Sequence, residues 1–96
     1  MLFRSLWIAS GNGHLDVVRF LQQSGADVNT ANNNGATPLC IASQNGHSAL
    51  ARLLARRGAN VKQVITAPSG RQGTSVDMAK VCGHLELAQW LRTVQV

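Results

Sequence analysis

The chain has 96 residues, which is enough for one small domain. Two cysteines are too few for a disulfide framework, and no stretch approaches the roughly 20 apolar residues of a membrane span. The net charge of +5 permits an acidic partner, but aromatic residues make up only 4% of the chain, which disfavours a stacking surface for single-stranded nucleic acid. We therefore expect a soluble, intracellular protein, cytoplasmic or nuclear, without a membrane span.

The first recurring element is the segment 9–29, which reads ASGNGHLDVVRFLQQSGADVN. It contains Gly11-Asn12-Gly13 ahead of an amphipathic stretch. A Gly-x-Gly pair can belong to a phosphate-binding loop, but such a loop follows a strand and opens a long helix, and no Gly-Lys-Ser/Thr occurs here. The later copies of the segment explain the pair better, as a turn between two short helices.

Two further copies of this segment follow along the chain. The second, ASQNGHSALARLLARRGANVK, begins 33 positions after Ala9, and the third, AKVCGHLELAQWL, begins at Ala79, a further 37 positions along. Each copy has a Gly-His pair followed by apolar residues at helical spacing. A period of 33 residues is typical of stacked helix-turn-helix units, and glycine suits the turn because it adopts a positive φ at little cost.

The middle copy also makes sense as local structure. Thr37 and Pro38 suit a helix start, because the hydroxyl caps free amide groups and proline fits the first helical position. Gly46 ends that helix, and a second one opens at His47. The apolar residues of this second helix share one face: Leu50, Leu53 and Leu54. Two such short helices cannot bury their apolar faces alone, so neighbouring units must stack.

The middle copy closely resembles the repeat of the ankyrin family. The sequence GATPLCIASQNGH at 35–47 is similar to the family pattern G-x-T-P-L-H-x-A-A-x-x-G-H, and GADVN at 25–29 is similar to the end of a family repeat. The resemblance implies an all-α fold, an α-solenoid of about three helix-turn-helix repeats joined by β-hairpin-like loops. The repeats would span about 1–31 (incomplete at its start), 32–64 and 65–96.

Two departures from the family pattern affect the expected structure. The histidine of T-P-L-H is replaced in all three copies, by Trp7, Cys40 and Asp77, so we do not expect its usual hydrogen bonds between repeats. The four extra residues of the third copy fall between Lys62 and Gln72. In the family geometry this segment is the hairpin between repeats two and three, so we predict an enlarged, flexible finger.

The chemistry-bearing side chains do not form a catalytic or metal-binding pattern. His14, His47 and His84 recur once per repeat, which would place them about 10 Å apart, too far to share a metal ion. They are better explained as turn residues that bond to backbone. Cys40 and Cys82 lack a catalytic histidine partner, since every histidine belongs to a repeat turn. We expect no metal, no cofactor and no enzymatic activity.

Large apolar residues suggest a core and an exposed end. Phe20, Leu53 and Trp90 occupy the same position of the three copies, and we predict that all three are core residues. Phe3 and Trp7 make the first residues apolar, where a terminal repeat should be polar. They could fold back over the first helix pair, or an upstream repeat, a partner or a second copy of the chain could cover them.

The resemblance implies that a protein or peptide partner binds on the concave face of the solenoid. Carried onto this chain, the positions that would bind it are Phe3, Trp7, Asn12, Asn33, Asn34, Ala36, Gln44, Asn45, Arg71 and Val81. Most of these side chains are neutral and several are amides, which can bond to extended backbone. Asn29 lies in a context similar to that in which ankyrin asparagines are hydroxylated, so its modification is a further expectation.

Two other functions remain open from the sequence. The chain could be a capping or spacer unit of a longer array, which would act in assembly or self-associate through its apolar N-terminus. Alternatively, Arg52, Arg56 and Arg57 could contact phosphates of a nucleic acid, although a solvated helix face explains them as well. We expect a protein partner rather than nucleic acid.

Overall fold

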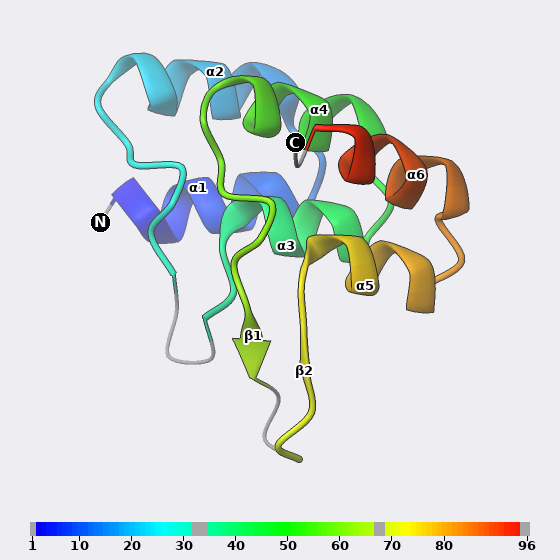
Figure 1. Cartoon of the computed structure of the whole chain (residues 1–96). Helices are drawn as coiled ribbons and strands as arrows, with labels where there is room; N and C mark the ends of the chain where they lie inside the picture. The colour runs from blue at the N-terminus through cyan, green and yellow to red at the C-terminus, as the bar shows by residue number, and fades with distance from the viewer. Residues whose placement is uncertain (1, 32–34, 67–68, 95–96) are drawn as a thin grey trace.

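The computed structural model describes residues 2–31, 35–66 and 69–94, with side chains from Ser5 onward (Figure 1). Its described helices form three consecutive pairs, with a short hairpin before the last pair. The pairs are α1 (Leu2–Gly11) with α2 (Leu15–Gln23), α3 (Pro38–Gln44) with α4 (Ser48–Arg56), and α5 (Ser75–Val81) with α6 (Leu85–Thr93). The hairpin strands are β1 (Ile65–Thr66) and β2 (Gln72–Gly73).

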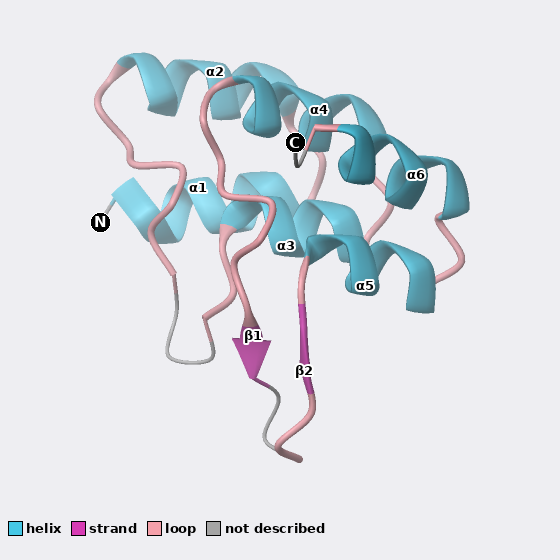
Figure 2. Ribbon diagram, in the orientation of Figure 1, coloured by secondary structure: helices cyan, strands magenta, loops and turns pink. Residues whose placement is uncertain are grey.

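The helices are arranged in two rows (Figures 1 and 2). The inner row consists of α1, α3 and α5, which contact one another in sequence, and α2, α4 and α6 form an outer row. Each helix also packs against the other member of its pair. No helix in the described ranges is long and apolar enough to cross a lipid bilayer.

Two inner helices begin with a threonine cap, and the sequence predicts the one at Thr37. The Thr37 side chain accepts a hydrogen bond from the backbone N–H of Cys40 at 3.4 Å, and Pro38 is the first residue of α3. At the start of α5, Asp77 Oδ2 accepts a hydrogen bond from the Thr74 backbone N–H at 2.9 Å. Asp77, which stands at the position of the family histidine, therefore helps to cap its own helix.

The turns between paired helices are made by glycines with positive φ. Gly13, Gly46 and Gly83 have φ values of 74°, 76° and 85°. Residues other than glycine adopt this conformation at a cost of about 1–2 kcal/mol. The recurring Gly-His pair is thus explained by backbone geometry, as the sequence predicts.

A continuous apolar core lies between the two rows of helices. It includes the buried leucines of all three pairs, namely Leu6, Leu21, Leu39, Leu50, Leu54, Leu87 and Leu91. Alanines such as Ala42, Ala51 and Ala79 are also buried and allow the helices to approach closely. Because each unit contributes one layer, the core is completed only by stacking.

The prediction that Phe20 is a core residue is wrong. Its side chain is 66% exposed, whereas Leu53 and Trp90, at the equivalent position, are partly buried and pack against the core. Trp90 lies beneath the guanidinium of Arg52 on the preceding outer helix. In the described part of the chain no outer helix precedes α2, so the ring of Phe20 has no such neighbour.

The hairpin lies in the segment where the sequence places the four extra residues. β1 and β2 are antiparallel, with Ile65 opposite Gly73 and Thr66 opposite Gln72. Figure 2 shows the two strands projecting away from the helices. The finger ends at Thr74, where α5 begins, so its base is held against that helix.

Candidate protein-binding surface

A groove lies between the hairpin and the inner helix α5. It has a volume of about 270 Å³ and is lined by Ile65, Arg71, Gln72, Asp77, Met78 and Val81. Its apolar side chains come from both elements, and Val81 is 81% exposed. Arg71 and Asp77 add one charge of each sign. The groove can therefore hold an apolar side chain and bond to polar groups beside it.

The structure brings two of the predicted binding residues together in this groove. Arg71 from the hairpin and Val81 from the end of α5 are 10 positions apart and line the same cavity. Asn12 and Gln44 are exposed at the ends of inner helices, where a partner could reach them, and Ala36 is partly buried.

The other predicted binding residues differ from this expectation or lie outside the described parts. The Asn45 side chain donates a hydrogen bond to the Gly11 carbonyl at 2.8 Å, so it links repeats one and two. Trp7 is partly buried, with an indole N–H that has no hydrogen-bond partner within the described residues. Asn33, Asn34 and the side chain of Phe3 lie outside the described parts of the chain.

Side chains form hydrogen bonds between repeats although the histidine of T-P-L-H is replaced in all three copies. His47 Nε2 lies 2.9 Å from the Gly11 carbonyl oxygen, which confirms for this histidine the predicted bond to backbone. Cys40 Sγ lies 3.4 Å from the Ser75 hydroxyl of the next repeat. At Cys40 a contact between a thiol and a hydroxyl therefore links neighbouring repeats in a position where the family has a histidine.

Asn29 bridges the ends of repeats one and two. Its side chain donates to the Gly58 carbonyl at 3.0 Å and accepts from the Asn60 backbone N–H at 2.6 Å. The residue is exposed, but both ends of its amide are bonded. This arrangement gives Asn29 a structural role in stacking; its hydroxylation stays a prediction.

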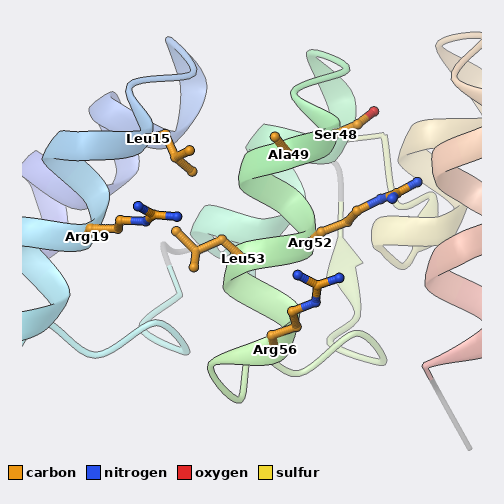
Figure 3. A pocket seen from close by; sticks show the side chains of 7 residues that line it. All are labelled: Leu15, Arg19, Ser48, Ala49, Arg52, Leu53 and Arg56. Atoms are coloured by element: carbon orange, nitrogen blue, oxygen red, sulfur yellow. The ribbon is translucent and has the colours of Figure 1, made fainter.

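A second, basic groove lies on the outer side of the stack, between α2 and α4. Its volume is about 410 Å³, and it is lined by Leu15, Arg19, Ser48, Ala49, Arg52, Leu53 and Arg56. Figure 3 shows Arg19 pointing across the groove toward Leu53, and Arg52 extending the other way, toward α6. Within the described residues none of these arginines forms an ion pair, and Arg52 lies 5.2 Å from the centroid of the Trp90 ring.

A comparison with protein families agrees with this architecture. A family model for ankyrin repeats, in three copies, matches residues 6–95. The chain belongs to the ankyrin-repeat family. The predicted fold, a helical solenoid of helix-turn-helix repeats, is thereby confirmed. No similar curated protein sequence was found.

Membership in the ankyrin family gives a general function. Ankyrin repeats are generally protein-protein interaction modules and are typically not enzymes. Within the described ranges, no three His, Cys, Asp or Glu side chains lie close enough together to hold a metal ion.

Sequence reasoning missed several residues of both grooves of the ankyrin array. In the hairpin groove these are Ile65, Gln72, Asp77 and Met78. Met78 could have been found, because it occupies the position of Ile41 in the preceding repeat. Arg19 could likewise have been added to the basic patch, because it occupies the position of Arg52. The approach of the hairpin to α5 had no local sequence signal.

Proposed function

We propose that the surface formed by the hairpin and the inner helices binds an extended segment of a protein partner. The observation that carries this proposal is the groove where Ile65, Met78 and Val81 meet beside Arg71 and Asp77. Apolar anchors surrounded by polar groups are typical of the centre of a protein interface. This groove contains two of the predicted binding residues, Arg71 and Val81.

The size of the groove favours a peptide segment over a small molecule. Pockets for drug-sized ligands span about 300–1,000 Å³ and enclose most of the ligand. This groove, at about 270 Å³, lies below that range, and its lining comes from the hairpin and α5. It fits one or two side chains of a segment that continues toward the exposed Gln44 on α3.

The proposal is tested by affinity capture from nuclease-treated lysate, followed by binding measurements with the purified partner. The wild-type chain is compared with an Arg71→Ala, Val81→Ser variant and with Arg57→Ala, which removes a positive charge from the outer row. We expect a protein that binds wild type and Arg57→Ala, and whose dissociation constant rises by roughly 30-fold for the groove variant, since a hot-spot truncation costs about 2 kcal/mol.

Two controls make the result decisive. The variants are checked by circular dichroism and urea unfolding, and both should match wild type because the changed side chains are exposed. If the captured proteins bind the groove variant as tightly as wild type, the groove is not the binding surface. An empty capture with wild type would also count against the proposal.

The basic outer groove supports a second candidate, binding to the phosphates of a nucleic acid. Arg19, Arg52 and Arg56 line one groove whose lining contains no acidic residue. Binding through phosphates weakens steeply with salt, because each contact releases counterions. An Arg19→Gln, Arg56→Gln variant should lower both the affinity and the salt slope. A wild-type chain whose binding to duplex DNA or RNA does not respond to salt would exclude this function.

A further inference from the structure

The two ends of the stack expose opposite halves of the interface that joins the repeats internally. We define the N-terminal end face by Asn12, His14, Val17 and Phe20, and the C-terminal end face by Val81, Gly83, Leu85 and Gln89. In the middle repeat, Asn45 and His47 bond to the first repeat, Gly46 is covered by His84 and Arg52 lies against Trp90, whereas Gln44 and Ser48 are exposed. The two end faces can therefore be compared with the junctions between repeats inside the chain.

The turn glycines show the difference most directly. A Cβ built on Gly13 would lie 2.7 Å from the His47 ring, and one built on Gly46 would lie 2.5 Å from the His84 ring. Each internal glycine is thus covered by the histidine of the next repeat. At Gly83 a Cβ would meet nothing within 4 Å. In the first repeat His14, the equivalent histidine, is exposed and covers no turn glycine within the described residues.

On the outer helices, too, each end of the stack exposes an apolar side chain whose equivalent in another repeat lies at a junction. Leu53 faces the groove beside α2, together with Leu15, and Trp90 lies against Arg52 of α4. The equivalents at the two ends are Phe20, which is 66% exposed, and Leu85, which is 58% exposed. A large apolar side chain at each end therefore lacks the contact that its internal equivalent makes.

The residues that form hydrogen bonds at the junction of repeats one and two also have equivalents that are exposed at the two ends of the stack. There Asn45 Nδ2 and His47 Nε2 both lie within hydrogen-bond distance of the Gly11 carbonyl, at 2.8 and 2.9 Å. The position of Gly11 is occupied in the third repeat by Val81, the last residue of α5, and helix-terminal carbonyls lack partners within their own helix. The positions of the two donors are occupied in the first repeat by Asn12 and His14.

Charge also favours contact between the two ends. Asp16 is exposed on α2, and its equivalent Ala49 lines the junction with the preceding repeat. Beside the C-terminal end face, Lys80 and Arg92 line a shallow pocket with Leu85, Ala88 and Gln89. The first repeat thus carries a negative charge at its end face, and the third repeat carries two positive charges beside its own.

We propose that the N-terminal end face of one molecule stacks on the C-terminal end face of a second copy. Phe20 would pack beside Leu85, the imidazole of His14 would cover Gly83, and Asn12 would donate to the Val81 carbonyl. A second copy fits because this contact continues the junction already present twice within the chain. The interface is head-to-tail, so each molecule uses both faces and association is open-ended or closes into a ring. Val81 belongs both to this end face and to the hairpin groove, whereas Phe20 and Leu85 lie outside the groove, so variants of these two residues test the stacking separately.

Sedimentation velocity over a concentration series tests the proposal. Wild type should form species larger than a dimer as concentration rises. Phe20→Glu and Leu85→Glu should each raise the dissociation constant by roughly tenfold or more. Mixed one to one, however, the two variants should form dimers and nothing larger, because one retains the intact C-terminal face and the other the intact N-terminal face. Val64→Glu, an exposed change in the finger, is the matched control and should associate like wild type.

Three results would overturn the proposal. A wild-type chain that stays monomeric throughout the series excludes it, and so does a mixture of the two variants that fails to dimerise. Loss of association with Phe20→Glu but not with Leu85→Glu would indicate a symmetric contact between N-terminal faces instead. Both changed side chains are largely exposed, and Phe20→Gln and Leu85→Gln provide the same test if a glutamate variant does not fold.

Discussion

The middle repeat and the first repeat have the same pattern but different surroundings. Leu50 is 2% exposed, whereas Val17, at the same position of the first repeat, is 46% exposed. The two helices have the same length and similar sequences, so the difference does not arise within the helix. It arises because α4 lies between two outer helices and α2 has one beside it. In a repeat protein, position within the stack decides what a given residue contributes to stability.

The largest expected effect is a cavity in the middle repeat. Leu50→Ala should lower the free energy of unfolding by about 2–5 kcal/mol, because the side chain is fully enclosed. Since a small domain has only a narrow stability margin, this change could unfold most of the population. Urea unfolding followed by circular dichroism measures it. A loss below about 1 kcal/mol would contradict the assigned packing.

Alanine substitutions of two turn glycines should distinguish the stability cost of backbone strain from the cost of a steric contact between repeats. Gly83→Ala should cost about 1–2 kcal/mol, from the positive φ alone. Gly13→Ala has the same strain and also places a methyl group against the His47 ring, which should add about 1 kcal/mol. The two midpoints are compared in urea at low protein concentration. If both substitutions lower the free energy of unfolding equally, the His47 ring moves aside at no energetic cost.

Asn29 should stabilise the fold through the two side-chain hydrogen bonds that join repeats one and two. Asn29→Ala removes both, and at about 0.5–1.5 kcal/mol for each bond the loss should be about 1–3 kcal/mol. Asn60→Ala is the matched control, because the Asn60 side chain accepts a bond from Lys62 within its own loop. Thermal and urea unfolding should therefore rank Asn29→Ala as the more damaging change, and the reverse order would refute the bridging role.

The smallest expected effect is at the exposed end. Phe20→Ala should change the free energy of unfolding of the monomer by no more than about 0.5 kcal/mol, because this side chain is 66% exposed. The measurement is made at a concentration low enough to avoid association. A loss comparable to that of Leu50→Ala would show that the first repeat is covered by a contact within the monomer.

Much of the fold could be predicted because the signals were local. The cap at Thr37, the turn at Gly46 and the apolar face of α4 depend on residues within one turn of helix. The periodic recurrence of these signals then predicts stacking, since single units cannot bury their apolar faces. The bond between Cys40 and Ser75 escaped prediction because a thiol replaced the residue that usually makes such bonds.

The candidate binding site was predicted in part. Arg71 and Val81, two of the predicted binding residues, line one groove, but Asn45 is bonded to Gly11 and serves the junction between repeats. Ile65 and Met78 were missed because they become neighbours only when the hairpin packs against α5. No local sequence pattern predicts that the hairpin packs against α5.

The sequence by itself determined the helix-turn-helix units, their caps and turns, and the number of their copies. These features follow from short-range backbone geometry and from periodic burial, which leave the same signal in every copy. Only the tertiary structure decided which copy of a repeated position is covered. Phe20, Leu53 and Trp90 share a pattern, but burial depends on whether a neighbouring helix lies against the side chain. That contact is a property of the stack and not of the residue.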